Sequence, residues 1–210
     1  MSETADNWSA ADVRRRVLAR GTADLEHDSG DHVLNPDLEQ LVERAAAREA
    51  AVLVPIVDRP EGATVILTTR ATGLRKHSGQ IAFPGGSVDP EDASVEAAAL
   101  REAREEIALE ESFVETLGRL PRYRTTTGFR ITPVLAIVRP GFALRPDPAE
   151  VADIFEVPLR FLMDEANHRR DSREWAGHMR FFYSMPFGDR MIWGVTAGIL
   201  RTLYERLYRS

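Results

Sequence analysis

Short runs of β-branched and apolar residues bounded by turn residues alternate with longer amphipathic stretches along this chain. Residues 51–57 (AVLVPIV) and 64–70 (TVILTTR) flank the turn DRPEGA and predict two paired strands. Further strands are expected at 113–125, 131–139, 172–179 and 180–187, and a closing amphipathic helix at 195–208. Strands that flank helices in mixed order favour an α/β or α+β fold over a helical bundle.

The first 50 residues have a different pattern and predict an N-terminal helical extension. One helix is expected at 9–20 with Ser9 as its N-cap. A second is expected at 35–50, with Asn35 as cap and Pro36 as the first helical residue. The polar segment 21–32 between them is expected to be a loop. The chain is therefore divided into an extension at 1–50 and one domain at 51–210.

Composition narrows the class of partner. Of 210 residues, 43% are hydrophobic and 29% charged, as in ordinary soluble globular proteins. The net charge of −6 argues against bulk attraction to nucleic acid or to an anionic membrane. No apolar run approaches the ~20 residues that span a bilayer, and the absence of cysteine fits a reducing cytoplasm. A cytoplasmic protein is expected, and a homodimer is left open as its assembly.

The stretch SVEAAALREAREEI (94–107) predicts a helix, with Ser94 as N-cap, that gathers negative charge. At 100° per residue Glu102, Glu105 and Glu106 fall within one arc of about 100°, opposite Ile107. Like charges at this spacing mildly destabilise a helix. A bound hard divalent cation such as magnesium would make the same arrangement of carboxylates favourable. The alternative is a solvated helix face with an ordinary Arg101–Glu105 pair.

The residues before this helix favour a ligand site. FPGGSVDPED (83–92) places Gly85 and Gly86 in a tight loop, where glycine lets backbone N–H groups approach a ligand. The loop is not a P-loop, because GxxxxGK[ST] is absent, and it is not a dinucleotide-binding fingerprint, because GxGxxG is absent. A basic group just upstream suits a phosphate-rich ligand: Arg70, Arg75, Lys76 and His77.

Together the loop and helix resemble the Nudix box of the pyrophosphohydrolases, G-x5-E-x7-R-E-U-x-E-E-x-G-U, where U is a bulky aliphatic residue. The corresponding positions here are Gly86, Asp92, Arg101, Glu102, Glu105, Glu106 and Leu109. Aspartate replaces the first glutamate, the spacer to Arg101 is longer, Ala103 is small, and Ala108 stands where glycine is usual. The upstream run ILTTRATGLRKHSGQIAFPGG (66–86) is similar to the signature that precedes the box in coenzyme A pyrophosphatases.

The resemblance implies an α/β/α sandwich around a mixed sheet and a hydrolase that requires Mg²⁺ or Mn²⁺. Its implied substrate is coenzyme A or a derivative, cleaved to 3′,5′-ADP and a 4′-phosphopantetheine species. Glu102 and Glu106 would be direct metal ligands, and Glu105 a third ligand or the base. Arg101 would orient a carboxylate and brace the loop.

Some roles are less fixed. Some Nudix enzymes take the general base from a loop after the box, and Glu150 is the candidate here, with Glu156 second. Arg70, Arg75, His77, Gly85 and Gly86 are the candidate substrate-binding residues. Four aromatic residues are expected in the core: Trp175, Phe181, Phe182 and Trp193.

Two alternatives to the coenzyme A interpretation stay open. One is a Nudix hydrolase of another nucleoside diphosphate derivative, such as ADP-ribose, NADH or a nucleotide sugar, whose branches lack the 66–83 run. The other is a catalytically silent Nudix module that only binds nucleotide. The intact Glu102, Glu105 and Glu106 argue against the silent module, since such a protein need not retain the ligands.

Overall fold

The computed structural model describes residues 7–20, 28–38, 48–73, 79–175 and 177–209. Its helices are α2 (Ala10–Arg20), α3 (Asp31–Leu34), α5 (Val95–Ile107), α6 (Leu159–Leu162) and α7 (Val195–Leu207), with 3-10 turns at Pro36–Leu38, Glu111–Phe113 and Glu165–Asn167. Its strands are β1 (Ser29–Gly30), β2 (Arg48–Val57), β3 (Thr64–Arg70), β4 (Ile81–Ala82), β5 (Gly85–Ser87), β6 (Val114–Arg119), β7 (Tyr123–Arg124), β8 (Phe129–Val138), β9 (Val151–Pro158), β10 (Arg169–Trp175), β11 (His178–Phe187) and β12 (Arg190–Trp193).

A mixed sheet forms the centre of the protein. Its main path among the described residues runs β1-β7-β8-β2-β3-β4, while β5 pairs with β2, β6 with β8 and β9 with β3. The central pair, β2 and β8, is parallel from Arg48↔Phe129 to Val57↔Val138. Both strands are almost wholly buried beyond their first residues, as expected for a strand covered on both faces.

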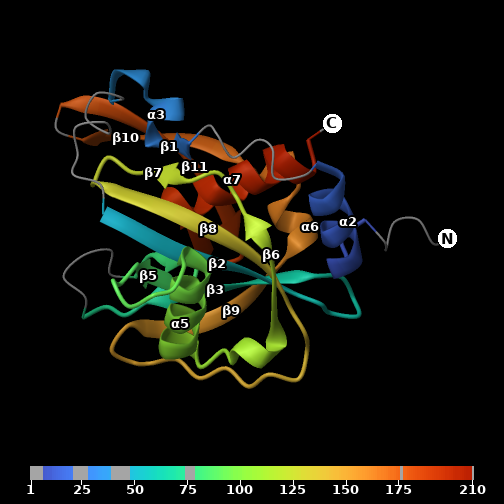
Figure 1. The fold of residues 1–210 in the computed structure, drawn as a ribbon. Coiled ribbons are helices and arrows are strands. Elements are labelled where there is room, and N and C mark those ends of the chain that lie inside the picture. Colours follow the sequence, from blue (N-terminus) through green and yellow to red (C-terminus); the bar gives the residue numbers. More distant parts are fainter. Residues whose placement is uncertain (1–6, 21–27, 39–47, 74–78, 176, 210) are drawn as a thin grey trace.

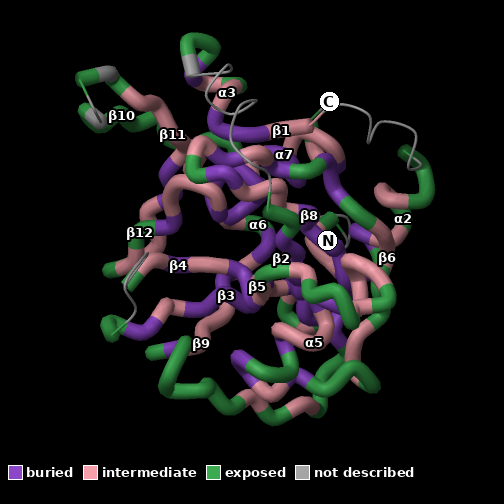
Figure 2. Tube along the Cα trace, turned by 60° about the vertical axis from the view of Figure 1, so that its left-hand side comes forward, coloured by how far each residue is buried: buried purple, intermediate pink, exposed green. Residues whose placement is uncertain are grey.

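Helices cover both faces of this sheet (Figures 1 and 2). On one face, Ala98, Ala99, Ala103 and Ile107 of α5 pack with Leu53 and Val134. On the other face, α7, α6 and α2 pack against the opposite side of the same strands. The predicted sandwich of helices around a mixed sheet is therefore confirmed.

The N-terminal segment agrees with the predictions in one part and differs in another. The helix at 10–20 is confirmed, and the Ser9 hydroxyl accepts a hydrogen bond from the Asp12 amide (3.1 Å). The helix expected at 35–50 is wrong at both described ends. Residues 36–38 form a 3-10 turn, and residues 48–50 begin β2 because β8 offers a parallel partner from Phe129 onward. Residues 39–47 lie outside the described residues.

Asn35 is not a helix N-cap. Its side chain donates to the carbonyls of Asp31 (2.7 Å) and Phe181 (2.9 Å) and accepts from the Phe181 amide (2.7 Å). The expected loop at 21–32 is also wrong at its end, because Ser29–Gly30 pairs with β7 and α3 begins at Asp31. Helix α2 and residues 29–35 contact the rest of the chain, and β2 begins at Arg48. The division into an extension at 1–50 and a domain at 51–210 stays a prediction.

The C-terminal half contains elements that the sequence pattern did not predict. Strand β9 follows the Pro-rich loop and pairs antiparallel with β3, and β12 completes a three-stranded sheet in the order β10-β11-β12. Phe181, Phe182 and Trp193 are half-buried on this smaller sheet rather than in the core, and the rings of Phe182 and Trp193 lie 5.4 Å apart. The side chain of Trp175 is not among the described ones.

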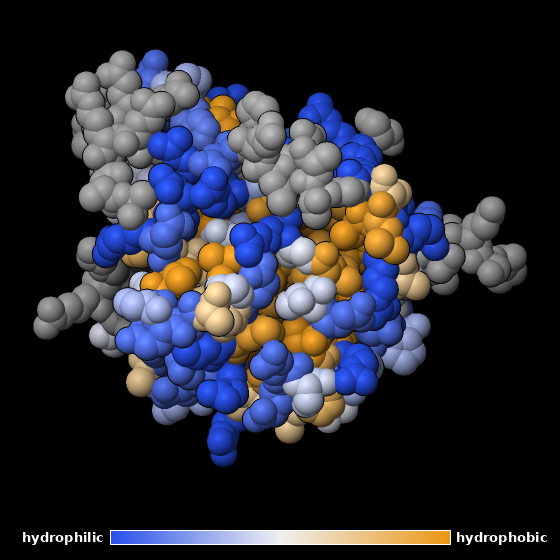
Figure 3. Space-filling view, in the orientation of Figure 1, coloured by the Kyte–Doolittle hydropathy of each residue, from blue (hydrophilic) through white to orange (hydrophobic). Residues whose placement is uncertain are grey.

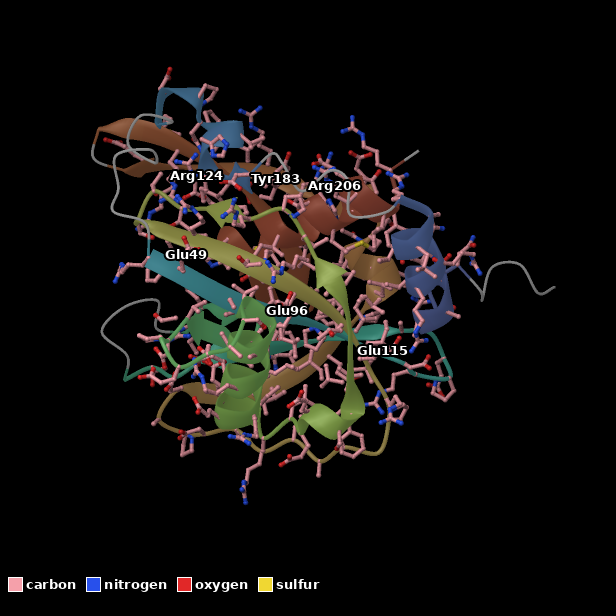
Figure 4. The ribbon with its side chains drawn as sticks, in the orientation of Figure 1. Glu49, Glu96, Glu115, Arg124, Tyr183 and Arg206 are labelled. Carbon is pink, nitrogen blue, oxygen red and sulfur yellow. The ribbon has the colours of Figure 1, made fainter. Side chains whose placement is uncertain are left out.

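Ion pairs on the surface connect β6 to α5 and to α2. Glu96, in the first turn of α5, pairs with Arg119 of β6 (2.5 Å), and Glu115 of β6 pairs with Arg14 of α2 (2.5 Å; Figure 4). Figure 3 shows that this face is mostly hydrophilic, with apolar side chains grouped between α5 and β6. Within the described part of the chain, no helix is long and apolar enough to cross a membrane.

Candidate active site

Helix α5 is specified locally and carries the acidic residues of the site. The Ser94 hydroxyl accepts from the Ala97 amide (3.2 Å), as predicted, and the alanines and Ile107 form a smooth apolar side against the sheet. The helix ends at Ala108, whose backbone is left-handed (φ 55°). This explains why glycine is usual at that position, since a side chain there is disfavoured.

The two glycines of the loop have separate reasons to lack side chains. Gly85 has φ 152°, and a Cβ there would overlap the backbone of Ala51 and Val52 on the neighbouring strand β2. At Gly86 a Cβ would instead lie 2.6 Å from the carboxylate carbon of Glu102. Strand β5 therefore approaches β2 closely at Gly85. At Gly86 it leaves room for the Glu102 carboxylate of α5.

The three glutamates do not share one environment. The side chain of Glu105 is 55% exposed, that of Glu102 is 16% exposed, and that of Glu106 is only 4% exposed. The Glu106 carboxylate accepts a hydrogen bond from the Gly85 amide (3.0 Å). The Gly85 N–H, which the sequence predicted to face a ligand, thus donates to the Glu106 carboxylate instead.

Arg101 is the centre of a hydrogen-bond network around the loop. Its guanidinium binds both oxygens of Asp92 (3.0 and 2.9 Å). It also donates to Glu102 (3.0 Å), Glu105 (3.0 Å) and the Ser87 carbonyl (3.2 Å). A planar donor set of this kind fixes several acceptors at once, so Arg101 joins the loop to the helix and orients Glu102.

Burial controls the protonation of the acidic residues. Loss of solvent raises the pKa of Glu106 to about 7, against the opposing effects of the Gly85 amide and Arg70. Burial also raises the pKa of Glu102, although Arg101 opposes the shift. In contrast, the hydrogen bonds from Arg101 lower the pKa of Asp92. The charge of Glu150 contributes to the raised pKa of both Glu102 and Glu106.

Strand β3 brings a cation to this cluster that helix periodicity alone could not predict. The Arg70 guanidinium lies 3.7 Å from the Glu106 carboxylate, at the end of β3. Next to it, the Ala71 amide donates to the Glu150 carbonyl (2.8 Å). Arg75 and His77 lie outside the described residues.

The second candidate base, Glu156, is held elsewhere. Its carboxylate binds Arg59 (2.5 Å) and the Thr64 hydroxyl (2.5 Å), near the start of β3. Arg70 is six residues further along that strand, roughly 20 Å away at about 3.3 Å per residue. Glu156 is therefore separated from the acidic cluster.

Hard divalent cations prefer oxygen ligands, and Glu102 and Glu106 both bring carboxylate oxygens to the glycine loop. Within the described part of the chain, however, no three acidic or histidine side chains form a ready ligand group. In this structure Arg101 pairs with Glu102 and Glu105, and Arg70 lies 3.7 Å from Glu106. Ion binding would require these carboxylates to exchange arginine contacts for metal contacts.

Residues 47–178, more than half of the chain, match the family model described as NUDIX domain. The chain belongs to the Nudix family. Proteins named "Uncharacterized Nudix hydrolase NudL" are similar to it. That of Cronobacter sakazakii is 46% identical over 157 residues, covering 74% of this chain and 81% of the relative. That of Escherichia coli O157:H7 is 46% identical over 164 residues, with the same shares covered.

Solved structures show the same Nudix fold at low identity. The NUDIX domain of Shewanella oneidensis NrtR, solved with ADP ribose, matches with TM-score 0.50 and 19% identity over 84% of this chain and 97% of that one. A Caenorhabditis elegans Ap4A hydrolase binary complex matches with TM-score 0.50 and 16% identity over 75% of this chain and 96% of that one. The range matched by the family model includes the glycine loop and α5.

Proposed function

We propose that this Nudix hydrolase cleaves the diphosphate of coenzyme A, or of an acylated or oxidised derivative, to 3′,5′-ADP and a 4′-phosphopantetheine species. The observation that carries the proposal is the run at 66–86, similar to the coenzyme A pyrophosphatase signature and continuous with the box. The fold supports it, because β3, the glycine loop and α5 bring both parts of this motif to one acidic cluster.

The reaction is addition of water to one phosphorus of the diphosphate. The new P–O bond forms as the bridging P–O bond breaks, and the leaving phosphate keeps the bridging oxygen. The water proton is accepted by a base. A divalent cation, Mg²⁺ or Mn²⁺, would neutralise phosphate charge and lower the pKa of water when bound.

The chain's own residues have separable roles in this proposal. Glu102 and Glu106 would hold the cation, with Glu105 as the more exposed third ligand. Arg101 would keep Glu102 oriented through its Asp92 contact. Glu150 is proposed as the base, since its charge acts on both Glu102 and Glu106 from the loop before β9.

Recognition of the ribose 3′-phosphate is proposed for the basic run at 70–77. A charge-assisted hydrogen bond to this group is worth about 1.5–3 kcal/mol. Arg75 and His77 stay predictions for that role. Arg70, which lies 3.7 Å from the Glu106 carboxylate, is proposed to bind the diphosphate instead.

A product survey tests the function. The purified protein is incubated with coenzyme A, 3′-dephospho-coenzyme A, ADP-ribose, NADH and a nucleotide sugar, with Mg²⁺ or Mn²⁺, and products are read by mass spectrometry. Coenzyme A should yield 3′,5′-ADP and 4′-phosphopantetheine, and EDTA should stop the reaction. Much faster turnover of ADP-ribose or NADH would reject the substrate assignment while leaving the family intact.

A further inference from the structure

Glu106 is a carboxylate that needs a positive partner. Its side chain is almost fully buried, so its charged form has little contact with water. One oxygen accepts from the Gly85 amide, and the other lies 3.7 Å from Arg70. Glu102 and Glu150 add further negative charge nearby. Within the described residues, Arg70 is the cation that pairs with this carboxylate.

The backbone of Arg70 is held in place, whereas its guanidinium is only loosely held by Glu106. The Arg70 backbone is held by hydrogen bonds to Gln80 (2.9 Å) and Gly79 (3.1 Å), so the residue stays at the end of β3. Its side chain keeps 27% of its surface exposed. The 3.7 Å separation exceeds the ~2.7–2.9 Å of a charge-assisted hydrogen bond, so the guanidinium can leave without breaking a tight contact.

Arg101 behaves differently in the same site. Its bidentate contact with Asp92 does not involve Glu102, Glu105 or Glu106, so it retains a firm anchor if those glutamates turn toward a cation. Arg70 has no such anchor within the described part of the chain, where Glu106 is its ion-pair partner. The two arginines therefore differ in whether they can move.

We infer that Arg70 is an internal counter-cation of Glu106 that is exchanged for the catalytic divalent ion, after which its guanidinium serves the substrate diphosphate. The second half of this inference rests on the proposed function. Arg70 would thus stabilise the metal-free protein, compete with the metal for Glu106, and become a substrate-binding residue only in the metal-loaded state. Metal binding would thus free the Arg70 guanidinium to bind a phosphate group of the substrate.

Metal affinity without substrate tests the first half. Mn²⁺ is titrated calorimetrically into the full chain at about pH 8.5, well above the ordinary pKa of a carboxyl group. Arg70→Met should bind Mn²⁺ roughly tenfold more tightly, equivalent to about 1.4 kcal/mol, because the competing charge is gone. Arg70→Lys keeps a cation and should resemble the unsubstituted protein.

Arg59→Met is the matched control. Arg59 forms an ion pair with Glu156 (2.5 Å) near the start of β3, so its loss removes an arginine–glutamate pair without touching the acidic cluster. Its Mn²⁺ affinity should be unchanged. Thermal melts add a second readout: Arg70→Met should melt lower than the unsubstituted protein without metal, and at the same temperature when saturated with Mn²⁺.

The second half is tested with methylenediphosphonate, a diphosphate analogue that water does not cleave. Its affinity for the Mn²⁺-saturated protein should fall roughly tenfold in Arg70→Met and stay unchanged in Arg59→Met. Unchanged or weaker Mn²⁺ binding in Arg70→Met, or equal losses of melting temperature with and without metal, would overturn the inference and leave Arg70 as a structural brace. These outcomes do not affect the proposed function, which the product survey decides separately. Absence of Mn²⁺ binding by the unsubstituted protein would reject both.

Discussion

The carboxylate of Glu102 lies where a side chain at Gly86 would begin, with its carbon 2.6 Å from the position of a Cβ. The glycine is therefore required by the acidic residue that approaches it. Gly85, its neighbour, is required by the backbone of β2 instead. Because a side chain would meet backbone atoms at Gly85 but a flexible carboxylate at Gly86, the two positions should respond differently to the same substitution.

Gly86→Ala should weaken Mn²⁺ binding and catalysis while changing the free energy of unfolding by less than about 1 kcal/mol, because a flexible carboxylate can turn away. Gly85→Ala should destabilise the protein by about 2–4 kcal/mol, since its methyl group meets backbone atoms at a positive φ. Urea unfolding and Mn²⁺ calorimetry on both variants measure this contrast. Equal stability losses would show that both glycines serve the backbone.

Glu106→Gln should change how the metal-free protein responds to pH. Burial raises the pKa of Glu106 to about 7, whereas glutamate in an unfolded chain titrates near 4.3. The folded state then binds more protons between these values, so this residue's contribution to stability is present at low pH and is lost as pH rises through 7. From about pH 5 to pH 8 the unsubstituted protein should lose roughly 2 kcal/mol that Glu106→Gln retains.

Chemical denaturation of both proteins in EDTA at these two pH values makes the comparison. Glu102→Gln and Glu106→Gln should also lose most activity and divalent affinity, because each deletes a proposed charged ligand. An identical pH dependence in the two proteins would mean that Glu106 is already ionised at little cost. Full activity in either variant would show that the substituted carboxylate is not a required metal ligand.

Glu150→Gln tests the proposed base. It should lower kcat with Mn²⁺ affinity and KM nearly unchanged, the pattern of an interaction made in the transition state. Steady-state kinetics and Mn²⁺ calorimetry provide both readouts. Glu156→Gln is the control, because that carboxylate is bound to Arg59 and Thr64 away from the cluster. An unaltered kcat in Glu150→Gln would transfer the base role to Glu105 or to a water bound by the metal.

Ala108→Gly should stabilise the protein by about 1 kcal/mol. Ala108 ends α5 with φ 55°, a conformation that costs alanine more than glycine. Its amide still donates to the Arg104 carbonyl (3.0 Å), so the helix end is otherwise complete. Thermal melting would show a higher midpoint, and a lower midpoint would contradict the left-handed cap.

The sequence predicted α5 closely because local signals agree there. The Ser94 cap and the alanine-rich apolar side both act within a few residues, so no distant partner is needed to place the helix. Strands β2 and β3 were equally clear from β-branched runs between turns. Where the chain depends on distant partners, the pattern failed: residues 48–50 join β2 because β8 lies beside them, and β9 forms because β3 has a free edge.

The same limit applies to the active site. Helical periodicity put Glu102, Glu105 and Glu106 on one arc, but the packing of the glycine loop against α5 buries Glu106 and leaves Glu105 exposed. The approach of Arg70 to Glu106 spans 36 positions in the sequence and has no local signal. Spacing can thus identify the chemical groups of a site, while their protonation and counter-ions depend on the tertiary fold.

Competition between substrates in one mixture tests the preference for coenzyme A. Equal concentrations of coenzyme A, ADP-ribose and NADH are given to the protein with Mn²⁺, and the initial rates of product formation give the ratios of kcat/KM. We expect coenzyme A to be consumed first, with 3′,5′-ADP and 4′-phosphopantetheine as products and no reaction in EDTA. Preferential consumption of ADP-ribose or NADH, with coenzyme A left intact, would contradict it.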